Sequence, residues 1–278
     1  SETLSKVLYP NDGTDEGRRL RLKQQHFFVS CSLQDMLRSL EKRSIPITEF
    51  PKHWTVQLND THPAIAVAEL MRLLIDQYQI GWDKAWNITT SSVAYTNHTL
   101  LPEALEKWDL GLFNDLLPRH LEIIYEINWR FLQQLRLRYP GDDKILQKLS
   151  IIDEEGSKSV RMAHLATIGA HHINGVAALH SDLIKRQLLP EFAALWPEKF
   201  TNVTNGVTPR RWVALSNPSL SNLLEEEVGP NWITNMELLK KLEEKKDDNN
   251  FLEKFEETKL NGKRKLASFI HSKTGILV

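Results

Sequence analysis

Three short apolar runs of this 278-residue chain each end in a cluster of polar residues. Asp60-Thr61-His62 follows the first run, Asn97-His98-Thr99 the second and Thr204-Asn205-Gly206 the third. Histidine and asparagine side chains both donate and accept hydrogen bonds, and histidine changes charge near neutral pH. If the runs are neighbouring parallel strands, their polar ends meet at one edge of a sheet, where α/β proteins bind ligands. We therefore predict that the three clusters contribute to one binding site.

Each cluster also has a purely structural interpretation. A histidine in a loop more often packs or bonds a backbone group than binds a ligand, and Asp60-Thr61-His62 taken alone would serve equally well as a helix cap. Thr208-Pro209, just after the third cluster, is typical of a helix start, because proline loses no hydrogen bond in the first turn. The recurrence of polar clusters at several strand ends favours convergence on a site.

The residue types indicate what such a site would bind. Asn11 and Asp12, in a turn-forming segment, add to the neutral and acidic hydrogen-bonding groups. These groups suit a polyhydroxylated ligand, because a sugar needs many paired donors and acceptors, and they fit phosphate less well. The phosphate-binding motifs GxxxxGK[ST] and GxGxxG and the hydrolase motif GxSxG are absent. A glycosidase would need two flanking carboxylates, but spacing selects no pair among Asp12, Asp60, Glu103 and Glu106.

The elements that would position the clusters alternate between short strands and amphipathic helices. Residues 54–58 alternate like a strand and are followed by helical spacing over 65–78. The run 93–96 is a second strand, after which Pro102 begins a helix. Residues 200–205 are the third strand-like segment. We further predict helices at 16–41, 110–117, 118–139, 162–186 and most of 215–270, with a hairpin of 151–153 and 159–161.

The predicted helix 162–186 requires a separate test for metal binding, because His164, His171 and His172 would share one of its faces. No carboxylate or cysteine lies at ligand spacing beside them, and the HExxH motif is absent. We predict histidines that pack or bond the backbone, and no metal site.

Composition excludes several classes of protein. A net charge of −1 provides no overall field to attract nucleic acid or an anionic membrane, and no apolar run approaches the roughly 20 residues of a membrane helix. The single cysteine, Cys31, excludes an internal disulfide and suits a reducing compartment. Because Phe28, Val29 and Leu33 surround it in sequence, we predict a buried, inert thiol. The chain begins at Ser1 in mid-pattern, so we expect a piece of a longer polypeptide.

Several segments, in order along the whole chain, resemble the glycogen/starch phosphorylases. They are Val7-Leu8-Tyr9-Pro10-Asn11-Asp12, Leu20-Arg21-Leu22-Lys23-Gln24-Gln25, Gln57-Leu58-Asn59-Asp60-Thr61-His62-Pro63, Ala94-Tyr95-Thr96-Asn97-His98-Thr99, Leu101-Pro102-Glu103-Ala104-Leu105-Glu106, Leu116-Leu117-Pro118-Arg119-His120 and Thr204-Asn205-Gly206-Val207-Thr208-Pro209-Arg210-Arg211-Trp212. The resemblance implies an enzyme that cleaves α-1,4-glucan with inorganic phosphate and releases glucose 1-phosphate. It also implies a helix-rich α/β fold of two Rossmann-like lobes (GT-B type), with pyridoxal phosphate in the cleft.

The resemblance also implies roles for individual residues. His98 is similar to the catalytic-site histidine that bonds the 6-hydroxyl of the glucosyl unit, with Asn205 beside it and Val176 as an apolar wall. Asn11 and Asp12 fall on the family's mobile gate loop, where Gly13 replaces the second asparagine of some relatives. The remaining matches are His62 and Glu106 on the far side of the pocket, and Trp212 near the cofactor phosphate.

By the same resemblance, residues 1–207 are the rear part of the N-terminal lobe and residues 208–278 are the first helices of the C-terminal lobe. The Schiff-base lysine of pyridoxal phosphate and the phosphate-handling motifs would lie beyond Val278, so the isolated chain is expected to be inactive. The family's regulatory sites would lie before Ser1. The parent is expected to be a homodimer in the cytoplasm, or in the plastid of a plant.

Two alternatives stay open. The chain is also compatible with a non-catalytic glucan-binding or interaction module on the same scaffold. The plainest alternative is a helical scaffold that binds no ligand.

Overall fold

A four-stranded parallel sheet organises the first of two units in the computed structural model, which describes residues 2–278. The first unit ends at Asn205 and the second spans Gly206–Val278. The strand order is β1-β2-β6-β7, with each neighbouring pair parallel. The strands are β1 Val56–Asn59, β2 Val93–Thr96, β6 Ile173–Gly175 and β7 Phe200–Asn202. The helix-rich α/β class predicted from the sequence is confirmed.

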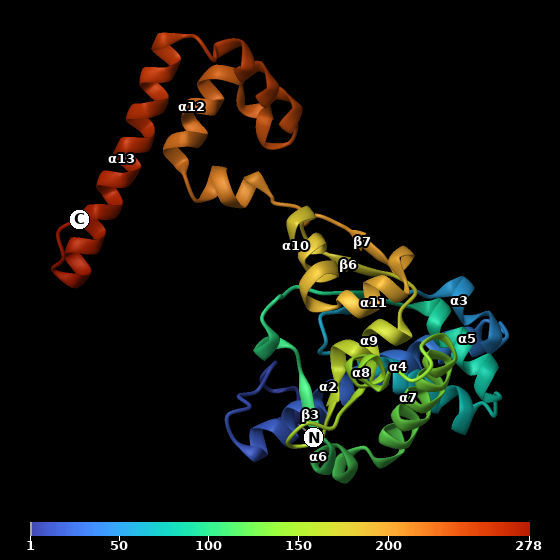
Figure 1. Cartoon of the computed structure of the whole chain (residues 1–278). Helices are drawn as coiled ribbons and strands as arrows, with labels where there is room; N and C mark the ends of the chain where they lie inside the picture. Colours follow the sequence, from blue (N-terminus) through green and yellow to red (C-terminus); the bar gives the residue numbers. More distant parts are fainter. Residues whose placement is uncertain (1) are drawn as a thin grey trace. The chain divides into compact units, whose positions relative to one another are not determined.

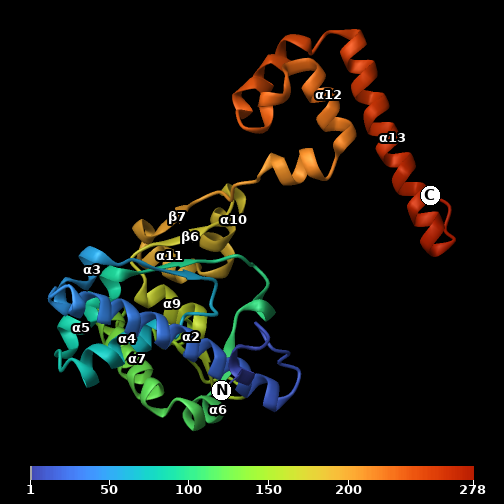
Figure 2. The same ribbon diagram turned by 180° about the vertical axis from the view of Figure 1, so that it is seen from behind.

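Helices connect the parallel strands and cover the sheet (Figure 1, Figure 2). Helix α4 packs among α2, α5, α7 and α9, while α10 packs against β6 and β7. The α-helices of this unit are α1 Glu2–Ser5, α2 Asp15–Lys42, α3 Phe50–His53, α4 Ala66–Arg72, α5 Trp82–Ser92, α6 Leu110–Leu116, α7 Pro118–Arg138, α8 Asp143–Leu149, α9 Met162–Gly169, α10 Ala178–Leu183 and α11 Pro190–Leu195. Shorter 3-10 and π turns are η1 Ile47–Glu49, η2 Leu73–Gln77, η3 Pro102–Ala104, η4 Ile184–Leu188 and η5 Pro197–Lys199.

Helix α2 confirms the long helix predicted at 16–41. The Thr14 side chain accepts a hydrogen bond from the Gly17 N–H and so caps the helix start. The predicted burial of Cys31 is wrong, because its thiol is exposed. The buried face of α2 contains Val29 and Leu33, and Cys31 lies two residues from each, on the opposite side of a helix with 3.6 residues per turn.

A second, antiparallel sheet has the order β3-β5-β4, with β3 Lys107–Asp109, β4 Ile152–Asp153 and β5 Ser159–Arg161. The predicted hairpin at 151–161 is therefore confirmed. The helix predicted to begin at Pro102 is wrong, because η3 ends after one turn and Leu105 is already extended. Trp108 is buried and pairs with Val160, so pairing with a distant strand overrides the helix-start signal.

The helix predicted at 162–186 is also wrong. Helix α9 ends at Gly169, and the chain then forms β6, with Ile173 fully buried between β2 and β7. Gly169 is the last residue of α9 and Gly175 the last residue of β6, and both are points of close packing. A Cβ would lie 2.6 Å from the Val67 side chain at Gly169 and 2.5 Å from Ser181 Oγ at Gly175. A three-residue strand inside an apolar stretch has no periodicity of its own.

The second unit is helical, as predicted for most of 215–270. It comprises η6 Arg210–Leu215, α12 Pro218–Val228, η7 Pro230–Ile233, η8 Met236–Lys245 and α13 Asn249–Thr274. Trp232 is fully buried, and Leu223, Leu224 and Phe251 are the other buried apolar residues of this unit. Among residues 2–278, no helix combines the length and apolar character needed to span a lipid bilayer.

Candidate functional site

The carboxyl ends of the parallel strands bring the polar clusters to one edge of the sheet, as predicted. The ends of β1 and β2 are joined where His98 Nε2 lies 2.6 Å from Asn59 Oδ1. The ends of β2 and β6 are joined where Thr96 Oγ1 donates to Asn174 Oδ1 at 2.7 Å. These bonds fix the loops that follow the strands, so the positions of the cluster side chains depend on the register of the sheet.

The cavity at this edge has a volume of about 780 Å³ and contains three of the predicted site residues, Asp12, His62 and Glu106. Its remaining lining comes from Arg18, Arg21, Asp60, Thr99 and residues 102–105, 107 and 108. This volume lies within the range of about 300–1,000 Å³ typical of small-molecule sites. The segment after Pro102, which we predicted as a helix, is extended from Leu105 onward and forms one wall of the cavity.

Glu106 is the centre of the polar network in the cavity. Its carboxylate accepts hydrogen bonds from Gln25 Nε2 at 2.6 Å and from Thr61 Oγ1 at 2.9 Å. His62 Nδ1 lies 3.4 Å from Glu106 Oε1, an ion-pair distance without hydrogen-bond geometry, and Arg21 Nε lies at 3.9 Å. Burial opposes ionisation of Glu106, but the contacts with His62 and Gln25 outweigh burial and hold the pKa of this carboxyl below its usual value.

The same network raises the pKa of His62. Its contact with the Glu106 carboxylate favours the imidazolium, and this effect exceeds the opposing effect of burial. Together the two shifts favour a charged pair, with a carboxylate on one side and a protonated ring on the other.

Several buried polar atoms around Glu106 have no hydrogen-bond partner among the described residues: Arg21 Nε, Gln25 Oε1 and His62 Nδ1. Buried polar groups in folded proteins are normally paired, and an unpaired one costs about 1–3 kcal/mol. Arg21 and His62 also line the cavity, so hydroxyl groups of a ligand, or water, bound there could complete the network.

Asp12 and Asn11 lie on a turn that closes onto the cavity. Asp12 accepts a 2.8 Å hydrogen bond from Arg21, whereas Asn11 is exposed and its side chain accepts from the Gly13 N–H. The turn passes so close to α2 that a Cβ at Gly17 would lie 1.9 Å from the Asn11 carbonyl oxygen. Asp12 therefore reaches the cavity, and Asn11 is held in the turn beside it.

His98, Val176 and Asn205 form a second group along the same edge. Asn205 donates its backbone N–H to the Val176 carbonyl at 3.0 Å, and the Val176 N–H donates to His180 Nδ1 at 3.1 Å. Burial and the nearby His98 lower the pKa of His180, so its ring is neutral and accepts this bond. The His98 ring is exposed and free to meet a ligand on the side away from Asn59.

A fully buried asparagine, Asn97, fixes the loop that carries His98. Its amide donates to the Tyr95 hydroxyl and accepts from the Thr99 N–H, both at 3.1 Å. Our sequence reasoning named neither this role nor the Glu106 partners Arg21 and Gln25. The signal for the latter two was present, because residues 21 and 25 are one helical turn apart beside the apolar face of α2.

The remaining predicted residues belong to other elements of the chain. Trp212 belongs to the second unit, where it is 64% exposed on η6, and its predicted contact with the cofactor stays a prediction. His164 is on α9 with its Nδ1 2.9 Å from the Ser150 carbonyl, whereas His171 and His172 precede β6, so the three share no helical face. His26, Glu69 and His120 do gather in the core, but Arg72 bonds Glu69 through two nitrogens and already neutralises it.

Pyridoxal phosphate does not fit the residues that line this cavity. The lysine among them, Lys107, is bonded to Asp153 at 2.9 Å. The two arginines are bonded to Asp12 and Asp15, which leaves no uncommitted cation for the cofactor phosphate. The cavity can bind and orient a polyhydroxylated molecule, and its own residues offer no site for the cofactor.

A helix-rich α/β unit with a polar cavity at the carboxyl edge of its parallel sheet is typical of ligand-binding proteins of the Rossmann-like class. The family model described as carbohydrate phosphorylase matches residues 1–278, so the chain belongs to the carbohydrate phosphorylase family. The fold is consistent with part of the two-lobed GT-B type.

Relatives with similar sequences are glycogen phosphorylases. The enzyme of Synechocystis sp. is 58% identical over 278 residues, covering 100% of this chain and 33% of the relative. That of Chlamydia trachomatis is 49% identical, covering 99% and 34%, and the human liver form is 45% identical, covering 98% and 33%. The chain spans about a third of the length of these relatives.

Proposed function

We propose that this chain is the sugar-binding part of an α-1,4-glucan phosphorylase, the enzyme that releases glucose 1-phosphate from glycogen, starch or maltodextrin with inorganic phosphate. The observation that carries the proposal is the Glu106 cavity, where unpaired buried polar atoms surround an ionised carboxylate. Family membership supports the same reaction. We assign residues 1–207 to the N-terminal lobe and residues 208–278 to the start of the C-terminal lobe.

In this proposal His98 positions the terminal glucosyl unit. Asn59 Oδ1 accepts from Nε2–H of the ring, which leaves Nδ1 as an acceptor for a sugar hydroxyl. Asn205 and Val176 would border the same unit, and Asp12, His62 and Glu106 would line the opposite side. The Glu106–His62 pair keeps both side chains charged and oriented, so that their hydrogen bonds to the ligand are charge-assisted.

Pyridoxal phosphate belongs to the proposed parent enzyme, in which its phosphate supplies proton transfer when bound. We place its Schiff-base lysine outside this chain, and Trp212 near its phosphate. On the same family basis we propose a homodimeric parent located in the cytoplasm, or in the plastid of a plant.

The test is turnover by two forms of the protein. The protein at its natural length should release glucose 1-phosphate from maltodextrin and phosphate, whereas the isolated 278-residue chain should not. Isothermal titration should nevertheless detect weak binding of maltooligosaccharides by the isolated chain. Turnover by the isolated chain would show that the placement of the cofactor outside it is wrong.

One observation favours a second candidate, a glucan-binding module without catalysis. The cations Arg18, Arg21 and Lys107, which line the cavity, are all bonded to carboxylates, so this edge offers no phosphate site of its own. Maltooligosaccharide binding without phosphorolysis in the natural-length protein would support this candidate.

A further inference from the structure

A second cavity of about 830 Å³ lies at the opposite edge of the parallel sheet. Thr90 precedes the start of β2, His171 precedes β6, and Lys199 directly precedes β7, so these lining residues mark the amino ends of the strands. The sugar site proposed above is at the carboxyl ends. The second cavity is therefore a separate place in the molecule, and its ligand chemistry does not depend on the proposed phosphorolysis.

Four indole rings dominate the walls of this cavity: Trp82, Trp86, Trp129 and Trp196. Phe131, Ile127 and Ile168 add further apolar surface. Trp129 is 56% exposed, although large aromatic side chains usually bury most of their surface. Flat rings around an open cavity favour a flat, apolar ligand, because stacked or edge-on aromatic pairs gain free energy beyond that of buried area.

The two cations of the cavity differ in their partners. Arg130 is neutralised, since it donates to Glu126 at 2.6 Å and to Asp83 at 2.9 Å while its guanidinium lies 4.9 Å from the centre of the Trp82 ring. Lys199 has no carboxylate within ion-pair distance among residues 2–278. Its amino group lies 3.9 Å from the centre of the Trp196 ring and makes one long hydrogen bond, 3.4 Å, to the Thr167 carbonyl.

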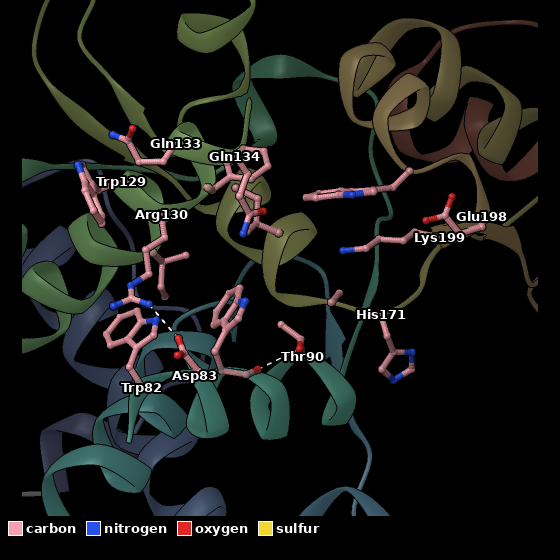
Figure 3. Close-up of a pocket in the computed structure, with 16 residues that line it drawn as sticks. Trp82, Asp83, Thr90, Trp129, Arg130, Gln133, Gln134, His171, Glu198 and Lys199 are labelled. Carbon is pink, nitrogen blue, oxygen red and sulfur yellow. Dashed lines mark hydrogen bonds and ion pairs between the residues drawn. The ribbon is translucent and has the colours of Figure 1, made fainter. Parts of the chain in front are cut away.

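Figure 3 shows the Lys199 amino group pointing toward the residues of α5 and α7 on the other side of the cavity, whereas the His171 ring points away from them. An ammonium has three donors, and among residues 2–278 only one acceptor, the Thr167 carbonyl, is bonded to Lys199. Burial lowers the pKa of Lys199 to about 8, because the loss of water around the charge outweighs the attraction of the nearby Glu198 carboxylate.

We propose that this indole-lined cavity binds a flat aromatic carboxylate, whose ring packs against the tryptophans and whose carboxylate pairs with Lys199. The ligand supplies the missing negative charge and the missing hydrogen-bond acceptors at one position. A neutral sugar would also stack on tryptophan, but it would leave the ammonium without its counter-charge. The nearby carboxylate of Glu198 is exposed and makes no ion pair with Lys199, so it does not fill this role.

The test compares two probes of nearly the same shape, 2-naphthoate and the neutral 2-naphthamide, in equilibrium dialysis against the chain at pH 7. Naphthoate should bind at least about tenfold more tightly, because a charge-assisted pair contributes about 1.5–3 kcal/mol. Lys199→Met should abolish this preference, and Lys199→Arg should keep it. Lys185→Met, which removes an exposed lysine elsewhere, should leave both affinities unchanged.

Two further measurements separate the contribution of the rings from that of the charge. Trp129→Ala should weaken both probes, since it removes ring surface and no charge. Raising the pH from 7 to 9.5 should reduce the preference about tenfold as Lys199 loses its proton. The other titratable groups of the cavity are Glu198, Asp83, Arg130 and His171. Burial lowers the pKa of His171, so its ring is neutral throughout this range.

Equal affinity of the two probes for the unmodified chain would overturn the proposal, as would a preference for naphthoate that survives in Lys199→Met. Displacement of naphthoate by maltotriose would also overturn it, because the cavity would then be a sugar site.

Discussion

The two edges of the parallel sheet differ in the charge at their centre and in how the protein pairs that charge. At the carboxyl edge, Glu106 is ionised and surrounded by donors, and the unpaired groups are polar atoms that a hydroxylated ligand can satisfy. At the amino edge, aromatic rings surround Lys199, whose charge has no partner among the described residues. The ligand chemistry of each edge therefore depends less on the fold than on which groups that edge leaves unpaired.

Removal of the central carboxylate should have the largest effect on the carboxyl edge. Glu106→Ala is expected to reduce the free energy of unfolding by about 3 kcal/mol, because it leaves His62 without its counter-charge and the donors of Gln25 and Thr61 without their acceptor. Asp12→Ala is the matched control, since its carboxylate is 54% exposed and should cost less than about 1 kcal/mol. Chemical denaturation of both variants measures the difference, and equal losses would contradict a buried network centred on Glu106.

His98→Ala tests the function of the same edge. In the natural-length protein we expect kcat/KM for maltodextrin to fall by roughly tenfold to a hundredfold, which corresponds to one lost sugar hydrogen bond of about 1–3 kcal/mol. His53→Ala removes an exposed histidine on α3, outside the site, and should leave the rate constant unchanged. An unaltered kcat/KM in His98→Ala would reject the positioning role.

The carboxyl edge was largely predictable from the sequence, and the amino edge was not. Polar residues at the ends of apolar runs are visible as local patterns, so convergence at one edge followed from parallel pairing. Glu106 acquired a role only from the family resemblance, because its partners Gln25 and Thr61 come from distant segments. The roles of the individual residues stay predictions.

The amino edge depends on contacts that leave no local pattern. Its lining residues come from α5, α7 and the ends of two strands, one of which, β6, was hidden inside a predicted helix. Lys199 looks like an ordinary surface lysine in sequence, since its neighbour Glu198 is a carboxylate. Only the fold shows that the two side chains do not pair and that the amino group lies against Trp196.

The smallest effect that we predict is a pH dependence at the carboxyl edge. The pKa of His62 is raised above its ordinary value of 6.5 by Glu106, so the folded state binds its proton more tightly than the unfolded state. This contribution to stability is complete below pH 6.5 and is lost as the pH rises through the folded pKa. Since the pKa of Glu106 is lowered from 4.5, that carboxylate does not titrate in this range.

We therefore expect the difference in unfolding free energy between the unmodified protein and His62→Gln to shrink by less than about 1 kcal/mol between about pH 6 and pH 9, measured by denaturation at each pH. His53→Gln, at an exposed position, should show no such change.

At the amino edge the change of stability with pH has the opposite sign. Because burial lowers the pKa of Lys199 from 10.5 to about 8, the free energy of unfolding relative to Lys199→Met should increase as the pH rises from 8 to 10.5. Opposite pH dependences of these two stability differences would show that the protein pairs the charge of His62 but not that of Lys199. pH dependences of the same sign would contradict that distinction.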